Sequence, residues 1–132
     1  MAIAFQDDGI RVAVNNLTAG ELATAKLHLF VHGPTISNAT TLGALTEASF
    51  SGYAAVTLSG WTSASVTAHV ASSSANPITF TLSSGTASIG GWYVTDSASS
   101  LLYAAGNDLA DPVAMSVTVN TYQVTLTVAD AS

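Results

Sequence analysis

The chain contains no cysteine and very few charged side chains. Without cysteine it can form no disulfide bond, no thiolate metal site and no cysteine nucleophile. Only 2 of its 132 residues are lysine or arginine, against 8 acidic residues, so the formal net charge is -6. Two cations cannot neutralise a run of phosphates, so we predict no nucleic-acid partner and no binding to an anionic membrane surface. There is no run of about 18 apolar residues, so we also predict no membrane-spanning helix.

Serine and threonine take the place of the missing charges. Each of them occurs 17 times, and alanine occurs 23 times. Apolar residues make up 48% of the chain, which is enough for a core and argues against disorder. No linker, charge run or change of composition divides the sequence, which therefore predicts a single domain over residues 1–132.

Apolar residues recur at every second position along most of the chain, as in strands with one buried face. The predicted strands lie at residues 10–15, 27–31, 50–58, 66–70, 78–82, 92–95, 101–105, 113–119 and 124–128. The apolar positions are odd-numbered over 113–119 and even-numbered over 124–128, which requires a turn or a bulge near Asn120 and Thr121. The pattern predicts an all-β fold, an antiparallel β-sandwich of about eight strands, most simply of the jelly-roll kind.

No residues occur at the spacing of a known catalytic motif, so we predict neither an enzyme nor a bound cofactor. His28 and His32 have the spacing that chelates a metal ion on a helix, but on a strand they stand about 13 Å apart. A calcium site formed by Asp96, Asp108 and Asp111 would lack the regular spacing of a calcium loop. We therefore predict no metal site.

Residues 48–95 include no Asp, Glu, Lys or Arg, a stretch of 48 residues. Free-standing β proteins usually place charges on their outermost strands, because an open strand edge recruits other chains. Two interpretations remain open. Either Ser and Thr hydroxyls keep this surface hydrated, or other subunits of a larger assembly cover it.

Several segments in a fixed order carry a resemblance to a known family. They are Leu27-His28-Leu29-Phe30, residues 44–53 (ALTEASFSGY), Trp61, Pro77-Ile78-Thr79-Phe80, residues 91–96 (GWYVTD) and Leu101-Leu102-Tyr103-Ala104. In this order they resemble motifs of small virion-associated proteins of tailed bacteriophages. The resemblance implies a capsid decoration (cement) protein on the outer surface of the capsid, made in the host cytoplasm. It also implies the major capsid protein as partner and self-association as a homotrimer.

The candidate functional residues are those that would face such a partner. They are Ile10, Val12, Val14, Trp61, Thr79, Thr81, Trp92 and Tyr93. The resemblance implies that residues 1–16 form an N-terminal arm, and the alternation of the first three residues predicts instead a strand added to a neighbour. The two threonines lie on the polar side of a neutral strand, and aromatic rings are typical of contact surfaces.

Three other functions remain open. The first is a tail-fibre or receptor-binding knob that recognises a host glycan or surface protein through rings such as Tyr103. The second is a bacterial surface or filament subunit. The acidic start of the chain predicts no signal peptide, which argues against this function. The third is a small hydrolase. The number of copies per virion separates a decoration protein from a knob.

Overall fold

The computed structural model describes residues 6–108, 111–116 and 119–129. They form one α-helix, α1 (Asp7–Ala19), and two short 3-10 helices, η1 (Glu21–Ala23) and η2 (Leu42–Ala44). The strands are β1 (Lys26–Val31), β2 (Val56–Thr57), β3 (Ser65–Thr67), β4 (Val70–Ser74), β5 (Ile78–Thr81), β6 (Thr86–Thr95), β7 (Leu102–Asn107), β8 (Val113–Ser116), β9 (Val119–Tyr122) and β10 (Thr125–Ala129).

The predicted all-β fold with antiparallel sheets is confirmed, because every strand pair that the structure describes is antiparallel. The jelly-roll form and the number of eight strands are not confirmed. In the described part of the chain, the strands form three sheets, with orders β2-β1-β6-β7 (β8 also pairs with β6), β10-β4-β3 and β5-β9.

The chain forms two compact units. Unit 1 consists of Met1–Thr24, Leu58–Pro77 and Gln123–Ser132, and unit 2 of Ala25–Thr57 and Ile78–Tyr122. The chain therefore passes between the units at four places, and no single linker separates them. This is why no change of composition marks a boundary in the sequence.

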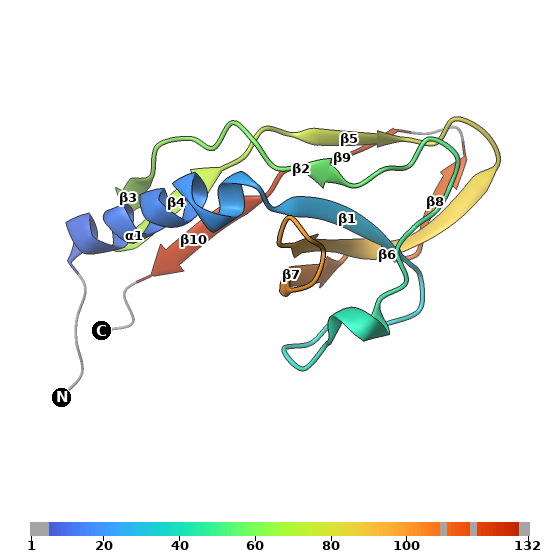
Figure 1. The fold of residues 1–132 in the computed structure, drawn as a ribbon, viewed down its shortest axis with the longest axis horizontal. Helices are drawn as coiled ribbons and strands as arrows, with labels where there is room; N and C mark the ends of the chain where they lie inside the picture. The colour runs from blue at the N-terminus through green and yellow to red at the C-terminus, as the bar shows by residue number, and fades with distance from the viewer. Residues whose placement is uncertain (1–5, 109–110, 117–118, 130–132) are drawn as a thin grey trace. The chain divides into compact units, whose positions relative to one another are not determined.

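In unit 1, helix α1 packs on the sheet β10-β4-β3 (Figure 1). Ile10 and Val14 of the helix meet Ala71 of β4 in one buried cluster, and Val66, Leu126 and Val128 pack against it. These strand residues lie on one side of the sheet, as alternation requires. Burial of this apolar face stabilises the helix on its sheet.

The predicted strand at residues 10–15, and with it the added strand, is wrong, because this segment lies in helix α1. Ile10, Val14 and Thr18 are its buried residues and are spaced four apart, whereas Val12 between them is 48% exposed. Asp7 and Asp8 in the first turn favour a helix, because carboxylates stabilise the positive end of its dipole. Ile10 and Val14 fit the period of a strand and that of a helix equally well.

The predicted strand at residues 66–70 is a hairpin instead. Thr67 of β3 is opposite Val70 of β4, and the two residues between them have positive φ, 51° at Ala68 and 62° at His69. Two positive φ angles are characteristic of a type I′ turn, whose twist matches that of the flanking strands. His69 Nδ1 lies 2.7 Å from Asp7 Oδ1 of α1, which links the tip of the hairpin to the helix.

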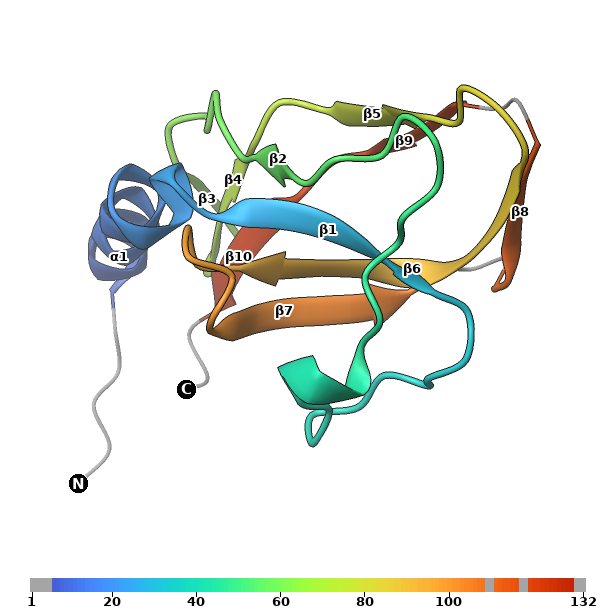
Figure 2. The same ribbon diagram turned by 45° about the vertical axis from the view of Figure 1, so that its right-hand side comes forward.

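In unit 2, β1 and β6 are the two inner strands of the largest sheet (Figure 2). β6 pairs with β1 on one side and with β7 and then β8 on the other. The predicted hairpin around residues 96–100 is confirmed as the turn between β6 and β7. Asp96 closes this turn by accepting hydrogen bonds from the Ser100 and Leu101 N–H groups at 2.6 and 2.9 Å. These bonds lower the pKa of its carboxyl group.

The change of parity near residue 120 has a different cause from the predicted one. Asn120 and Thr121 lie inside β9 and pair with β5, so no turn occurs there. Instead, the chain leaves unit 2 after Tyr122 and enters unit 1 at Gln123, before β10 begins.

The predicted single strand at residues 113–119 is also wrong, because β8 ends at Ser116 and pairs with β6, whereas β9 begins at Val119 and pairs with β5. β10 pairs with β4, so the apolar positions of β8, β9 and β10 belong to three different sheets.

Two alanine substitutions on α1 test the helical assignment. We expect Ile10→Ala to lower the free energy of unfolding by about 2–5 kcal/mol, because it leaves a cavity in place of the Ile10 side chain, which is 2% exposed. Val12→Ala should change it by about 0.5 kcal/mol or less, since Val12 lies on the exposed side. Urea unfolding of both variants measures the difference. Equal losses would indicate a strand with both residues on one face.

Candidate functional site

Strand β1 is buried on both of its faces. Leu27, Leu29 and Phe30 are 0–1% exposed, and His28 between them is 2% exposed. His28 is opposite Tyr93 of β6, and the two rings stack with centroids 4.5 Å apart and planes 7° apart. An imidazole in this position is out of reach of bulk water, so its two nitrogens need partners within the protein.

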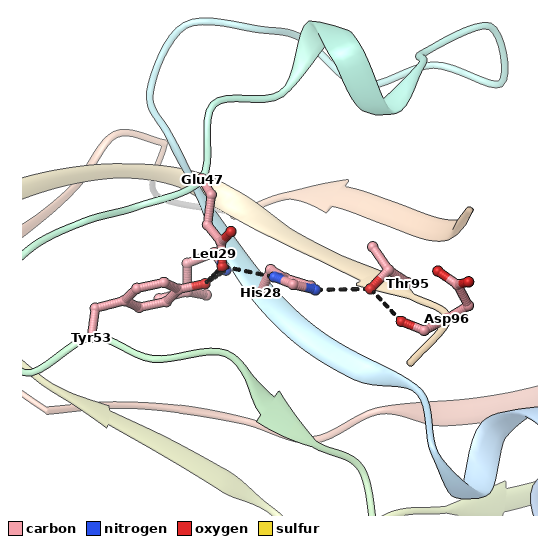
Figure 3. Close-up of polar contacts among 6 residues, drawn as sticks. All are labelled: His28, Leu29, Glu47, Tyr53, Thr95 and Asp96. Carbon is pink, nitrogen blue, oxygen red and sulfur yellow. Dashed lines mark hydrogen bonds and ion pairs between the residues drawn. The ribbon is translucent and has the colours of Figure 1, made fainter. Parts of the chain in front are cut away.

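Both ring nitrogens of His28 have such a partner (Figure 3). Nδ1 lies 2.8 Å from Oε1 of Glu47, and Nε2 lies 2.8 Å from Oγ1 of Thr95. Thr95 reaches His28 because it lies two residues after Tyr93 on the same face of β6. Glu47 comes from the segment that follows η2, which lies along the edge of β1, where Glu47 forms an antiparallel bridge with Phe30. We refer to His28, Glu47, Tyr53 and Thr95 as the His28 network.

The hydrogen bonds determine which groups of the network are donors. The Thr95 hydroxyl donates its single proton to the carbonyl oxygen of Asp96 at 2.9 Å, so it accepts a bond from His28 Nε2. On the other side, Nδ1 faces a carboxylate, which only accepts. Nδ1 therefore donates to the Glu47 carboxylate, and the Thr95 hydroxyl links Nε2 to the Asp96 carbonyl.

Tyr53 completes the network on the Glu47 side (Figure 3). Its hydroxyl donates to Glu47 Oε1 at 2.8 Å and accepts the Leu29 N–H at 3.2 Å. Burial raises the pKa of Tyr53, and its bond to Glu47 raises it further. Burial also raises the pKa of Glu47, but the hydrogen bonds from His28 and Tyr53 and the charge of His28 outweigh it, so this pKa is lowered. Burial raises the pKa of Tyr93 to about 12.

The network contains an acid, a histidine and a hydroxyl, as a nucleophilic triad does, but its geometry does not suit catalysis. Thr95 is 0% exposed and its proton is bonded to a backbone carbonyl. A nucleophile must meet its substrate, and this hydroxyl is enclosed by the protein. The arrangement instead joins β1, β6 and the segment around Glu47 by hydrogen bonds to charged groups.

A second polar cluster surrounds Asn107 at the end of β7. Its Oδ1 accepts the Ile36 N–H at 2.8 Å, and its Nδ2 donates to the Pro34 carbonyl at 3.0 Å. Nδ2 also lies 3.2 Å from Oδ2 of Asp111, whose Oδ1 is 2.6 Å from His32 Nδ1. These bonds hold the loop after β1 against the end of β7.

The three aspartates weighed as a calcium site are engaged separately. Asp96 is bonded within its own turn, and Asp111 to His32 and Asn107. Asp108 accepts the Tyr122 hydroxyl at 2.8 Å. Burial raises the pKa of Asp108, and the charge of Asp111 raises it further. Among the described residues, no three His, Cys, Asp or Glu side chains come close enough to hold a metal ion.

The predicted interface residues are divided between the two units. Four of them lie in unit 1 and four in unit 2. Ile10, Val14 and Tyr93 are 0–4% exposed, so they offer no surface to another subunit. Val12, Thr79 and Thr81 are exposed, and Trp61 and Trp92 are half-buried. The Trp61 indole N–H donates to the Leu22 carbonyl at 3.1 Å inside unit 1.

Sequence reasoning missed Glu47 and Thr95 as partners of His28, and Tyr53 as a partner of Glu47. Glu47 is the last charged residue before the uncharged stretch of residues 48–95, but its side chain is 44% exposed, so its place in the sequence does not indicate a buried partner. The separation of 67 residues between His28 and Thr95 leaves no local pattern that pairs them.

Comparison with known proteins adds no family: no family model, no curated protein and no solved structure matches this chain. In the described residues, no helix is long and apolar enough to cross a membrane.

The variant Glu47→Gln tests the ion pair of the His28 network. Because the pKa of Glu47 in the folded protein lies below its ordinary value of 4.5, its stabilising contribution is complete above that pH. The contribution is lost as the pH falls through the lower, folded value. We expect the wild type to be more stable than the variant at neutral pH, and the difference to disappear in acid.

Urea unfolding over a pH series measures this effect. Asp8→Asn removes the same charge outside the network and serves as the control. Asp8 is 91% exposed and its ion pair with Arg11 lies on the surface, so this variant should keep an acid dependence close to that of the wild type. A parallel pH dependence for Glu47→Gln and the wild type would contradict the assignment.

Proposed function

We propose that this protein is a structural component of a bacteriophage particle, a capsid decoration protein that binds the major capsid protein on the outer surface of the shell. The observation that carries the proposal is the absence of charge on the strand edges. The strands that the structure describes contain a single charged residue of the types Asp, Glu, Lys and Arg. It is Lys26, the first residue of the inner strand β1. The outer strands β2, β3, β7, β8 and β10 carry none.

Uncharged edges favour assembly for a physical reason. An outer strand presents unpaired backbone N–H and C=O groups, and monomeric proteins protect them with charges or proline. The described outer strands contain no proline either. Covering a neutral surface costs no desolvation of ions, so a partner can bind these edges. The resemblance to virion-associated proteins implies the major capsid protein as that partner, and a homotrimer fits the same neutral surface.

The number of copies per virion tests this proposal. Quantitative mass spectrometry of purified particles, scaled to the major capsid protein, should give a stoichiometry close to that of the capsid subunits. A few copies per particle would instead indicate a tail-fibre or receptor-binding knob. Absence from the particle would contradict a virion protein and favour a surface or filament subunit.

A lysine on β5 tests whether this strand is covered in the assembly. Thr81 is exposed, and β5 pairs with β9 alone among the described strands. We expect Thr81→Lys to weaken incorporation into particles more than tenfold, since an unpaired ammonium group is costly to bury. The isolated protein should keep its free energy of unfolding within about 0.5 kcal/mol.

The matched control is Asn16→Lys, which adds the same charge to the exposed side of α1. Incorporation is measured by competing each variant with the wild type for particles that lack the protein. Normal incorporation of Thr81→Lys would show that β5 is not part of the interface.

A further inference from the structure

An open groove of about 690 Å³ runs along β7 in unit 2. All six residues of β7 line it on one side, and Ile36, Ser37, Asn38 and Thr40 line it on the other. None of these residues is charged. The groove is therefore neutral and has an entire strand as one wall.

The lining indicates that the groove follows the edge of the sheet. Side chains alternate between the two faces of a strand, so a hollow on one face is lined chiefly by every second residue. Here six consecutive residues take part. β7 also ends its sheet: in the described part of the chain, it pairs with β6 and with no other strand. Ala104, Ala105 and Gly106 have little or no side chain, so the backbone is open to close approach.

The opposite wall is held in place by Asn107. Its amide bonds to the Ile36 N–H and to the Pro34 carbonyl fix the loop at one end of the groove. The loop also closes on itself, since the Thr40 Oγ1 accepts the Ser37 N–H at 2.9 Å. A wall formed before the ligand arrives lowers the entropic cost of binding.

We propose that this groove binds an extended, uncharged peptide, which adds to β7 as a further strand. A strand residue in a sheet occupies roughly 160 Å³, from its rise, the strand spacing and the sheet spacing, so the groove holds about four residues. Backbone hydrogen bonds to β7 supply the affinity, and the neutral loop wall selects against charged side chains. If the proposed function holds, the peptide is a segment of the major capsid protein; that identification rests on the proposed function, whereas strand addition does not.

A carbohydrate is the other ligand class that a neutral polar groove could take. The continuous strand edge favours a peptide, because a sugar ring does not repeat with the spacing of backbone N–H and C=O groups along β7. The test therefore includes both ligand classes.

The experiment pans the full chain against a library of random peptides of about eight residues, long enough to span the groove. We expect enrichment of peptides without charges or proline. Their affinity should fall at least tenfold for Ala104→Glu, which places a carboxylate at an exposed position in the groove. Ala114→Glu adds the same charge to an exposed position on β8, outside the groove, and should bind as the wild type does. Hydrogen exchange of the amides of β7 should slow at least tenfold when the peptide is bound.

Each other result overturns the proposal. No enrichment on the wild type, or equal affinity for both glutamate variants, would show that β7 accepts no strand. Binding of neutral oligosaccharides that is lost only in Ala104→Glu would assign the groove to a glycan. The outcome is independent of the copy number in virions, so strand addition and the decoration role can fail separately.

Discussion

Burial of β1 on both faces is the constraint on which unit 2 depends. A strand covered on one face could leave His28 in water, but here its ring stacks on Tyr93 and is 2% exposed. A buried polar group without a partner costs about 1–3 kcal/mol, and a charged one costs more. The Glu47 carboxylate and the Thr95 hydroxyl avoid that cost, and in doing so they join segments that are 19 and 67 residues from His28 in the sequence.

The sequence allowed prediction of those strands in which apolar and polar residues alternate within a single sheet. β1, β5, β10 and the hairpin of β6 and β7 lie where their apolar patterns indicated. Helix α1 was missed because Ile10 and Val14, four residues apart, are compatible with either period. The hairpin at Ala68 and His69 was missed because neither is a usual residue of a type I′ turn, where Asn and Gly predominate. In both cases tertiary packing decided between local alternatives of similar propensity.

The candidate site was less predictable than the fold. Alternation along residues 27–31 assigns His28 and Phe30 to the side facing away from Leu27 and Leu29, and a polar exterior was the simple interpretation. The structure covers that side too, and Phe30 is 0% exposed. The Glu47 side chain reaches His28 on that side, and it comes from a segment that has almost no regular secondary structure and hence no periodic signal. Sequence patterns show that a strand has two faces, but they do not show what lies against each.

The two interpretations of the uncharged surface differ in how its hydroxyls are used. Several of them pair with one another, as Thr79 with Thr121 at 3.0 Å and Ser74 with Thr125 at 2.7 Å. A hydroxyl has one donor and two acceptor sites, so each pair still has acceptor capacity for water or for a partner's N–H groups. Such a surface is wet when alone and loses no ion hydration when covered. A neutral, hydroxyl-rich edge is therefore compatible with both interpretations, because water can hydrate its hydroxyls and a partner can cover them without desolvating an ion.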